Sequence, residues 1–314
     1  MIDFRYHIVS IVAIFFALGA GVVLGAGPLK GTGSDLVQAQ ANKDRATVES
    51  QREQLLQAKA LDKYRDDFFA KVTAGLTDAK LTNKRIALVT MPGADNDMTE
   101  SLQEALEQAG GQVTTRVSLD SKLFDPGQRQ LVEPLVNDLV TSDITFPAES
   151  NTYQRAGMIL ARGISAREEA KPFDAESSKI ISGLASAKLV SLKTPKDRAS
   201  LVVVVAAKPA TPVPDNSSYN DAVDFAEGLD AGSAGSVVAG MPESAQNGGL
   251  LKALRGDSDA TKALSTVDVA NLPSGQMTVV FALVEQAGGK AGQYGGVDAK
   301  NGLAPAADMA KGNN

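Results

Sequence analysis

The sequence of 314 residues contains no cysteine and no tryptophan, and it has one histidine, His7. The absence of cysteine excludes disulfides, thiolate metal sites and cysteine nucleophiles together. Because His7 precedes a long apolar run, no histidine remains to act as a general base in the rest of the chain. No nucleophilic triad can be assembled from these residues, so we predict that the protein is not an enzyme.

The sequence also lacks an excess of positive charge. It has 31 Lys and Arg residues against 37 Asp and Glu residues, which gives a formal net charge of −6. Proteins that bind nucleic acids generally carry a basic patch or stripe, so no nucleic-acid partner is expected. Hydrophobic residues make up 43% of the chain, which is enough for a folded core in addition to a membrane anchor.

An apolar run from Ile8 to Gly27 has Ser10 as its only polar side chain. As an α-helix this run would measure about 30 Å, the thickness of a bilayer's hydrocarbon core. We therefore predict a membrane-spanning anchor. A cleaved signal peptide is the alternative, but the start of the chain has only Arg5 as a firm positive side chain. Pro28 also follows directly after the small residues at which cleavage would occur.

The charges that flank the apolar run predict its orientation. The amino terminus and Arg5 precede the run, and Lys30 follows it. The positive-inside rule then favours a cytoplasmic amino terminus, with the bulk of the chain on the extracytoplasmic side.

Small residues recur at four-residue intervals inside the run, at Ala17, Gly21 and Gly25. Such a ridge lets two membrane helices approach closely, and we consider it a candidate helix-packing site. Small residues are also common in membrane helices that do not pair, which is the alternative interpretation.

A long polar helix is predicted after the anchor. Residues 36–76 contain no proline and are rich in Gln, Ala, Lys, Glu and Asp. Apolar side chains recur every seven residues in the first half, at Ala41, Val48 and Leu55. They continue at intervals of three and four from Leu61, so the pattern is heptad-like with one phase shift. We predict a coiled coil over residues 34–80 that joins copies into a dimer or higher oligomer; packing on the following domain is the alternative.

Short apolar runs alternate with amphipathic segments after residue 80. The strands are expected at residues 85–90, 112–119, 188–192, 201–207, 236–240 and 266–269. The helices are expected at residues 97–108, 126–140, 151–163, 174–187, 219–229, 244–254 and 274–286. This alternation predicts an α/β domain over residues 81–287, with an open, mostly parallel, doubly wound sheet and helices on both faces. Residues 1–33 would hold the cytoplasmic start, the anchor and a linker, and residues 288–314 a disordered tail.

The first strand-to-helix corner, Thr90–Asp97, lies where doubly wound sheets bind ligands. It lacks the glycine spacing of a dinucleotide fingerprint and the lysine of a phosphate loop. Asp95 and Asp97 would ordinarily cap the following helix, and a ligand or acid–base role for them is the alternative. A second Met-Pro corner at Met241 repeats the pattern, which suggests that the domain contains two related halves.

The amino-terminal segment MIDFRYHIVSIVAIFFALGAGVVLGAGPL resembles the start of the actinobacterial MctB family, described as copper transport outer-membrane proteins. Three later segments are similar to the carboxyl-terminal pattern of that family: Pro273–Gln276, Ala282–Gln286 and Gly292–Gly295. The resemblance implies a role in copper homeostasis, by efflux or by keeping intracellular copper low. Copper would then be a transported or sensed ion, and no resident cofactor is predicted.

Methionines are the remaining candidates for copper ligands. Soft copper ions prefer Cys, Met and His, and here Cys is absent and His7 stands alone. Met91 and Met98 form a local pair, and Met91 would meet Met241 only if the two Met-Pro corners face each other. Ordinary packing is the alternative for all three side chains.

The localisation expected from the residues differs from the family's outer-membrane description. Outer-membrane channels are series of alternating strands of about ten residues, whereas this sequence has one apolar helix and a water-soluble α/β pattern. The main interpretation is a single-pass protein on the outer side of the plasma membrane that serves copper transport. The alternative is a cell-envelope scaffold without transport activity, whose coiled coil and domain recruit other envelope proteins.

Overall fold

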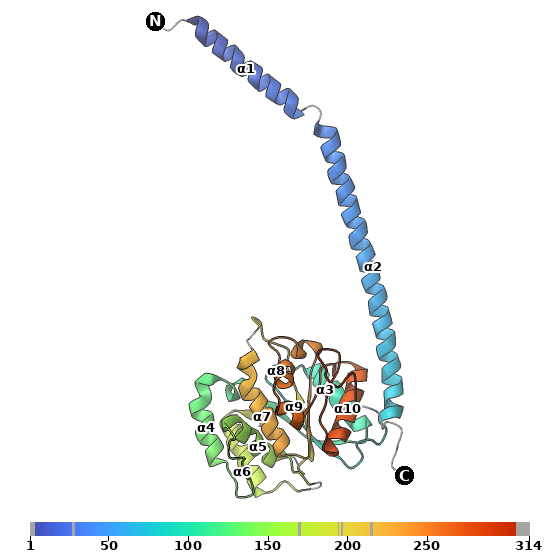
Figure 1. Ribbon diagram of the computed structural model, residues 1–314, viewed down its shortest axis with the longest axis vertical. Helices are drawn as coiled ribbons and strands as arrows, with labels where there is room; N and C mark the ends of the chain where they lie inside the picture. The colour runs from blue at the N-terminus through green and yellow to red at the C-terminus, as the bar shows by residue number, and fades with distance from the viewer. Residues whose placement is uncertain are drawn as a thin grey trace. The chain divides into compact units, whose positions relative to one another are not determined.

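The computed structural model describes residues 4–26, 29–168, 171–193, 195, 197–213 and 216–305. The chain consists of two compact units, Met1–Arg65 and Asp66–Asn314. The first unit contains α1 (Phe4–Ala26) and most of α2 (Leu29–Thr77), both labelled in Figure 1. The second unit begins with the end of α2 and contains the α/β domain.

Helix α1 has the properties of a membrane anchor. Its segment Tyr6–Gly25 is long and apolar enough to cross a membrane. The large apolar side chains along it are exposed. Added side-chain atoms at Gly21 or Gly25 would meet nothing within 4 Å, so the small-residue ridge that includes Ala17 is open to a partner helix. Pairing through this ridge stays a prediction.

Helix α2 carries a series of exposed apolar side chains. Within the first unit, its large apolar residues are each more than half exposed: Leu36, Val37, Val48, Leu55, Leu56, Leu61 and Tyr64. Local polar contacts support the helix, including a 3.0 Å ion pair between Arg65 and Asp62. A lone helix of this length gains little from such pairs, so the exposed apolar positions remain available for a partner.

The α/β domain is built on one sheet. Within the described residues the sheet has seven strands in the order β3-β2-β1-β4-β5-β6-β7. The strands are β1 (Arg85–Thr90), β2 (Gln112–Leu119), β3 (Val190–Leu192), β4 (Leu201–Val205), β5 (Ser236–Ala239), β6 (Ser265–Val267) and β7 (Gln293–Tyr294). Neighbours pair in parallel except β2 and β3, which are antiparallel. The strand order reverses between β1 and β4, and the predicted doubly wound fold is confirmed.

Both faces of the sheet are covered by helices. The α-helices are α3 (Asn96–Gln108), α4 (Arg129–Asp138), α5 (Thr152–Ile164), α6 (Ala175–Ser186), α7 (Asn220–Ala231), α8 (Leu250–Gly256), α9 (Ala260–Ala263) and α10 (Pro273–Ala287). The 3₁₀ helices are η1 (Ser121–Leu123), η2 (Pro126–Gln128), η3 (Asn216–Tyr219) and η4 (Pro242–Ala245). Successive residues of β4 alternate between two cores: Val202 and Val204 face α4 to α9, whereas Leu201, Val203 and Val205 face α3 and α10.

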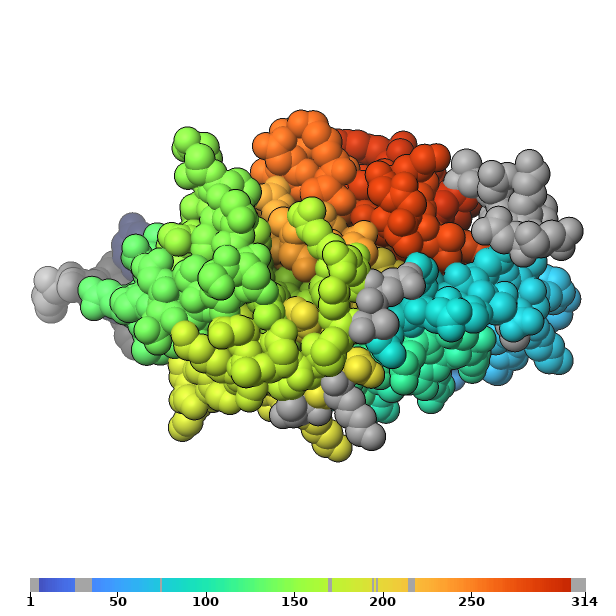
Figure 2. All heavy atoms as spheres, turned by 90° about the horizontal axis from the view of Figure 1, so that it is seen from below, coloured from blue at the N-terminus to red at the C-terminus, as the bar shows by residue number. Residues whose placement is uncertain are grey.

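The two groups of helices are separated along the domain. Figure 1 shows α4, α5, α6 and α7 on one side and α3 and α10 on the other. In Figure 2 the green and yellow segments around residues 130–190 gather at one end of the domain, away from the cyan segment around residues 80–100. The charged cavities described below lie at the green and yellow end.

The predicted disorder of residues 288–314 is wrong for residues 288–305. Strand β7 pairs with β6, and its residues Gln293 and Tyr294 are buried. The segment is held by polar contacts: Asp268 accepts hydrogen bonds from the amides of Gly296 and Val297. A Gly- and Ala-rich composition does not reveal such contacts, because they come from residues elsewhere in the chain. Residues 306–314 lie outside the described residues.

Two other sequence-based boundaries differ from the structure. The predicted helix over residues 244–254 is wrong in its first part, because η4 ends at Ala245 and α8 begins at Leu250. Gly248 between them has a φ of 76°, a conformation that favours glycine and ends a helix. The helix predicted over residues 126–140 is divided into η2 and the shorter α4.

Candidate functional site

Helices α5 and α7 cross at very short range. A Cβ atom built on Gly157 would lie 2.1 Å from the carbonyl oxygen of Phe225, and one built on Gly228 would lie 2.0 Å from the carbonyl oxygen of Gln154. Only glycine at these two positions lets the backbones approach so closely. The crossing fixes Met158, the residue after Gly157, between two cavities that it lines on either side.

The first cavity, named here the acidic pocket, has a volume of about 340 Å³. Four carboxylate side chains line it: Glu149, Glu227, Asp230 and Asp259. Met158 and small residues such as Gly228, Ala231 and Ala263 complete its wall. A methionine and four acidic residues therefore border the same space.

The two more buried carboxylates of the acidic pocket have neutral hydrogen-bond donors. Gln154 donates to Glu227 at 2.7 Å, and the Ser236 hydroxyl donates to Asp230 at 2.9 Å. Burial raises the pKa of Glu227, and the hydrogen bond from Gln154 opposes that rise. Burial raises the pKa of Asp230 to about 6, against the opposing effects of Ser236 and the charge of Arg167. Within the described residues neither carboxylate forms an ion pair, so a cation in the pocket would meet negative charge that Arg167 compensates only in part.

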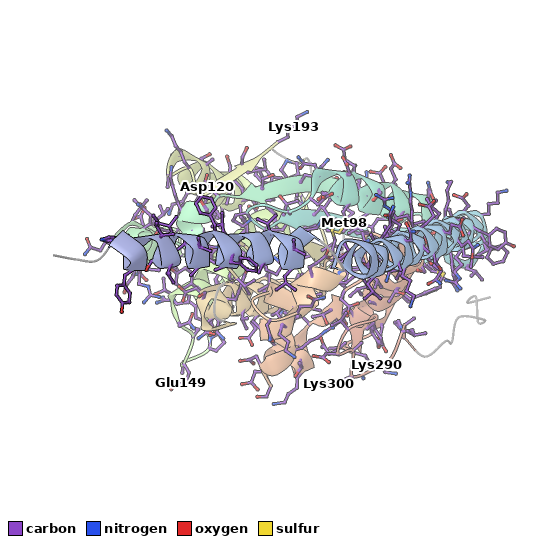
Figure 3. All side chains as sticks on the ribbon, turned by 90° about the horizontal axis from the view of Figure 1, so that it is seen from above. Met98, Asp120, Glu149, Lys193, Lys290 and Lys300 are labelled. Atoms are coloured by element: carbon purple, nitrogen blue, oxygen red, sulfur yellow. The ribbon has the colours of Figure 1, made fainter. Side chains whose placement is uncertain are left out.

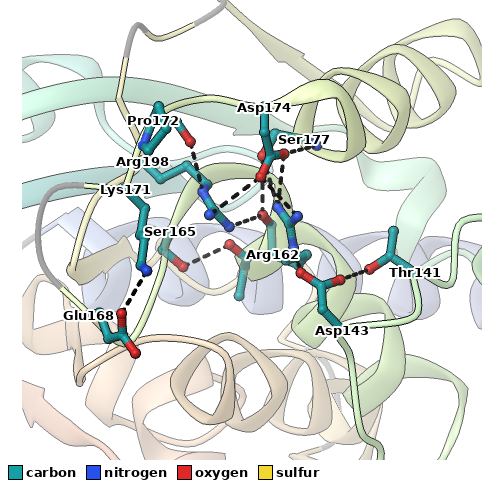
Figure 4. A network of polar contacts seen from close by, with 11 residues as sticks. Thr141, Asp143, Arg162, Ser165, Glu168, Lys171, Pro172, Asp174, Ser177 and Arg198 are labelled. Atoms are coloured by element: carbon teal, nitrogen blue, oxygen red, sulfur yellow. Dashed lines mark hydrogen bonds and ion pairs between the residues drawn. The ribbon is translucent and has the colours of Figure 1, made fainter.

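The second cavity, named here the arginine cavity, has a volume of about 480 Å³. Its charged lining residues are Arg162, Arg167, Lys171, Arg198, Asp143 and Glu168. Figure 4 shows the polar network behind it, in which Arg162 contacts Asp143 at 2.5 Å and Asp174 at 3.0 Å.

The carboxylates that hold Arg162 are kept ionised. Burial would raise the pKa of Asp174, but hydrogen bonds from Arg162 and Ser177 outweigh it and hold that pKa well below its usual range. The pKa of Asp143 is also lowered, because hydrogen bonds from Thr141 and Arg162 exceed the effect of burial. The network is therefore fully charged at neutral pH.

The three methionines singled out from the sequence are not brought together. Met91 packs in the core under α5 and α7, whereas Met98 and Met241 pack against the opposite face of the sheet. Strand β4 lies between β1 and β5, so the two Met-Pro corners are about 10 Å apart at their strands. Met98, labelled in Figure 3, is buried. Met91 and Met98 lie on opposite faces because the turn between β1 and α3 carries the chain from one face of the sheet to the other.

The Asp95 corner has a structural role. The Asp95 carboxylate accepts a hydrogen bond of 2.9 Å from the amide of Met98, so it caps α3. Asp97 lies in the first turn of that helix, where a negative charge is favourable.

Met158, Glu227 and Asp230 were not selected from the sequence. The sequence did contain one indication of an acidic surface on α7. Acidic residues recur there every three positions, at Asp221, Asp224, Glu227 and Asp230. The position of Met158 beside them depends on the glycine crossing of α5 and α7, which a single sequence does not show. Among the described residues, no group of three or more His, Asp and Glu side chains gathers at metal-binding distance.

A membrane-length apolar helix, a long polar helix and a doubly wound domain with charged cavities define a membrane-anchored α/β protein. A family model described as "Copper transport outer membrane protein, MctB" matches residues 1–305, and the chain belongs to this family. The family resemblance predicted from the sequence is confirmed.

Several curated relatives match nearly the whole chain. The proteins named copper transporter MctB of Mycobacterium bovis and Mycobacterium tuberculosis are each 26% identical over 308 residues, covering 94% of this chain and 96% of theirs. The protein of the same name from Mycobacterium leprae is 25% identical over 310 residues, with the same coverage.

Proposed function

We propose that the protein serves copper transport as a single-pass membrane protein, with its α/β domain on the extracytoplasmic side. The observation that carries this proposal is the family match over residues 1–305, together with relatives named copper transporters that span 94% of the chain. The apolar helix α1 supports the anchoring, and Arg5 before it supports the orientation. A single apolar helix suits a plasma-membrane anchor, whereas outer-membrane spans are β-barrels.

Within this function, the acidic pocket is the part of the domain that we assign to first contact with the copper ion. Met158 supplies a soft sulfur atom, and Glu227 and Asp230 supply negative charge without a cationic partner among the described residues. One thioether beside carboxylates would hold copper weakly. Weak binding suits an ion that must leave again.

Transport by this chain also requires more than one copy or an additional membrane partner. One α1 helix per chain cannot enclose a pore. The exposed apolar positions of α2, such as Val48 and Leu55, support a coiled coil that brings copies together beside the membrane.

Copper accumulation in a deletion strain tests the proposal. Full-length protein is expected to lower cell copper, and a version without residues 36–76 is expected to fail because its copies no longer assemble. Met158→Leu combined with Glu227→Gln should weaken complementation, whereas Met98→Leu, in the opposite core, should leave it intact. If full-length protein does not lower cell copper, the proposed function is wrong.

The second candidate function is a cell-envelope scaffold, and the exposed apolar series on α2 is the observation that favours it. A scaffold would bind envelope proteins through this series and affect copper only indirectly. Complementation that depends on residues 36–76 but not on the acidic pocket would favour the scaffold.

A further inference from the structure

The arginine cavity has more positive than negative charge on its wall. Among the described residues that line it, four side chains are cationic and two are anionic, which leaves an excess of two positive charges. Asp174 contacts two of the arginines but does not line the cavity (Figure 4). When Asp174 is counted with the lining residues, the cluster keeps an excess of one positive charge.

Arg198 is the least compensated of these cations. Its side chain is only 10% exposed. Asp174 binds Arg162 through both of its oxygen atoms, at 3.2 and 3.0 Å, and approaches Arg198 only to 3.5 Å. The other bonds of Arg198 go to the carbonyl oxygens of Pro172 and Arg162, at 3.2 and 3.3 Å. A buried guanidinium without a carboxylate of its own is unfavourable unless a counter-charge is supplied from outside.

Two further cations lie at the rim of the cavity. Arg167 donates to the carbonyl oxygen of Ala231, a neutral acceptor. Lys171 pairs with Glu168 at 2.7 Å, and both side chains are well exposed. An exposed pair of this kind contributes little free energy, so Lys171 can turn toward an anion at small cost.

We propose that the arginine cavity is a binding site for a small dianion of the phosphate or dicarboxylate type. The positive excess of the cluster attracts an anion, and guanidinium groups bind such oxyanions through paired hydrogen bonds. Arg198 contacts the anion from the base of the cavity, and Arg167 and Lys171 hold it from the rim. This site lies beside the acidic pocket, with which it shares Met158 and Ala231, but its anion-binding side chains are not those assigned to copper.

Calorimetric titration of the full-length protein in detergent, at pH 7.5 and constant ionic strength, tests the proposal with two probes. At this pH malonate is a dianion and inorganic phosphate is mostly one, and the two differ in shape, so they distinguish a phosphate-type ligand from a dicarboxylate. Saturable binding of either probe supports the site, and the tighter of the two identifies the ligand type. Absence of saturable binding of both probes overturns it.

The double variant Arg167→Gln/Lys171→Gln is the main test, because both side chains lie at the rim and their loss leaves the core intact. We expect its affinity for the bound probe to fall at least about tenfold. The matched control is Lys193→Gln/Lys290→Gln, which removes the same charge from the periphery of the domain (Figure 3) and should change affinity less than about twofold. Equal affinity in the rim variant and the control would overturn the proposal. Arg198→Gln should abolish binding, provided that circular dichroism shows it folded.

Discussion

Arg255 and Asp268 form a buried ion pair, with Nη1 and Oδ2 2.7 Å apart and side chains 3% and 0% exposed. Arg255 also donates to the carbonyl oxygen of Tyr294, and Asp268 accepts from the amide of Val297. The pair therefore fixes the carboxyl-terminal segment to the ends of β6 and β7, and its charges are satisfied only together.

Removal of one member of this pair should destabilise the domain strongly. Asp268→Asn leaves the Arg255 charge buried without a counter-charge, and we expect a loss of about 3–5 kcal/mol in the free energy of unfolding. Urea denaturation measures it. Lys252→Met is the control, because it breaks the more exposed pair with Asp298, and its cost should stay below about 1 kcal/mol. Similar losses in both variants would show that the buried pair has no special role.

Because α5 and α7 cross at two glycines, a change from glycine to alanine should lower stability at the crossing but not at an open position of α2. Gly157→Ala and Gly228→Ala would place a methyl group against backbone oxygens at 2.1 and 2.0 Å, so each should lower stability by about 1–3 kcal/mol or more. Gly75→Ala meets nothing within 4 Å in α2 and should be neutral or stabilising by up to about 1 kcal/mol. Melting temperatures measure these changes. A Gly157→Ala protein as stable as the original would contradict the close crossing.

The acidic pocket predicts a pH dependence of stability. The pKa of Asp230 is about 6 in the folded protein and near 3.8 in the unfolded chain, so the unfolded chain loses its proton first as pH rises. The contribution of this group to stability is therefore greatest below about pH 4 and is lost as pH rises through about 6. Asp230→Asn should raise stability at pH 7 by up to about 3 kcal/mol relative to the original protein, and by little at pH 3.5. A stability difference that does not change between these pH values would contradict the raised pKa.

The exposed apolar series of α2 predicts that assembly depends on one face of the helix. Val48→Glu combined with Leu55→Glu places charges on the predicted coiled-coil interface. The mass of the detergent-solubilised protein should therefore fall to that of a monomer. Ser50→Glu combined with Gln57→Glu adds the same charges on another face and should leave the mass unchanged. Light scattering coupled to size-exclusion chromatography measures the mass of both variants. An unchanged mass in the first variant would exclude an interface through Val48 and Leu55.

The fold was largely predictable because its signals are local. The run Leu201–Val205 is apolar at every position, as expected for a strand buried on both faces, and Asp95 stands where a helix cap is needed. The site was not predictable for the opposite reason. Met158 acquires its neighbours through the glycine crossing, and the segment around Tyr294 is ordered by Arg255, nearly forty residues earlier in the chain. Such contacts depend on distant residues whose pairing has no periodic signature in the sequence.

The most direct test of the copper function is the flux of copper across vesicles that contain the purified full-length protein. We expect copper entry above that of empty vesicles, reduced in Met158→Leu/Glu227→Gln and retained in Met98→Leu. We also expect loss of flux in the Val48→Glu/Leu55→Glu protein, which cannot assemble. Copper flux equal to that of empty vesicles, measured with correctly inserted and assembled protein, would contradict a transport function for this chain.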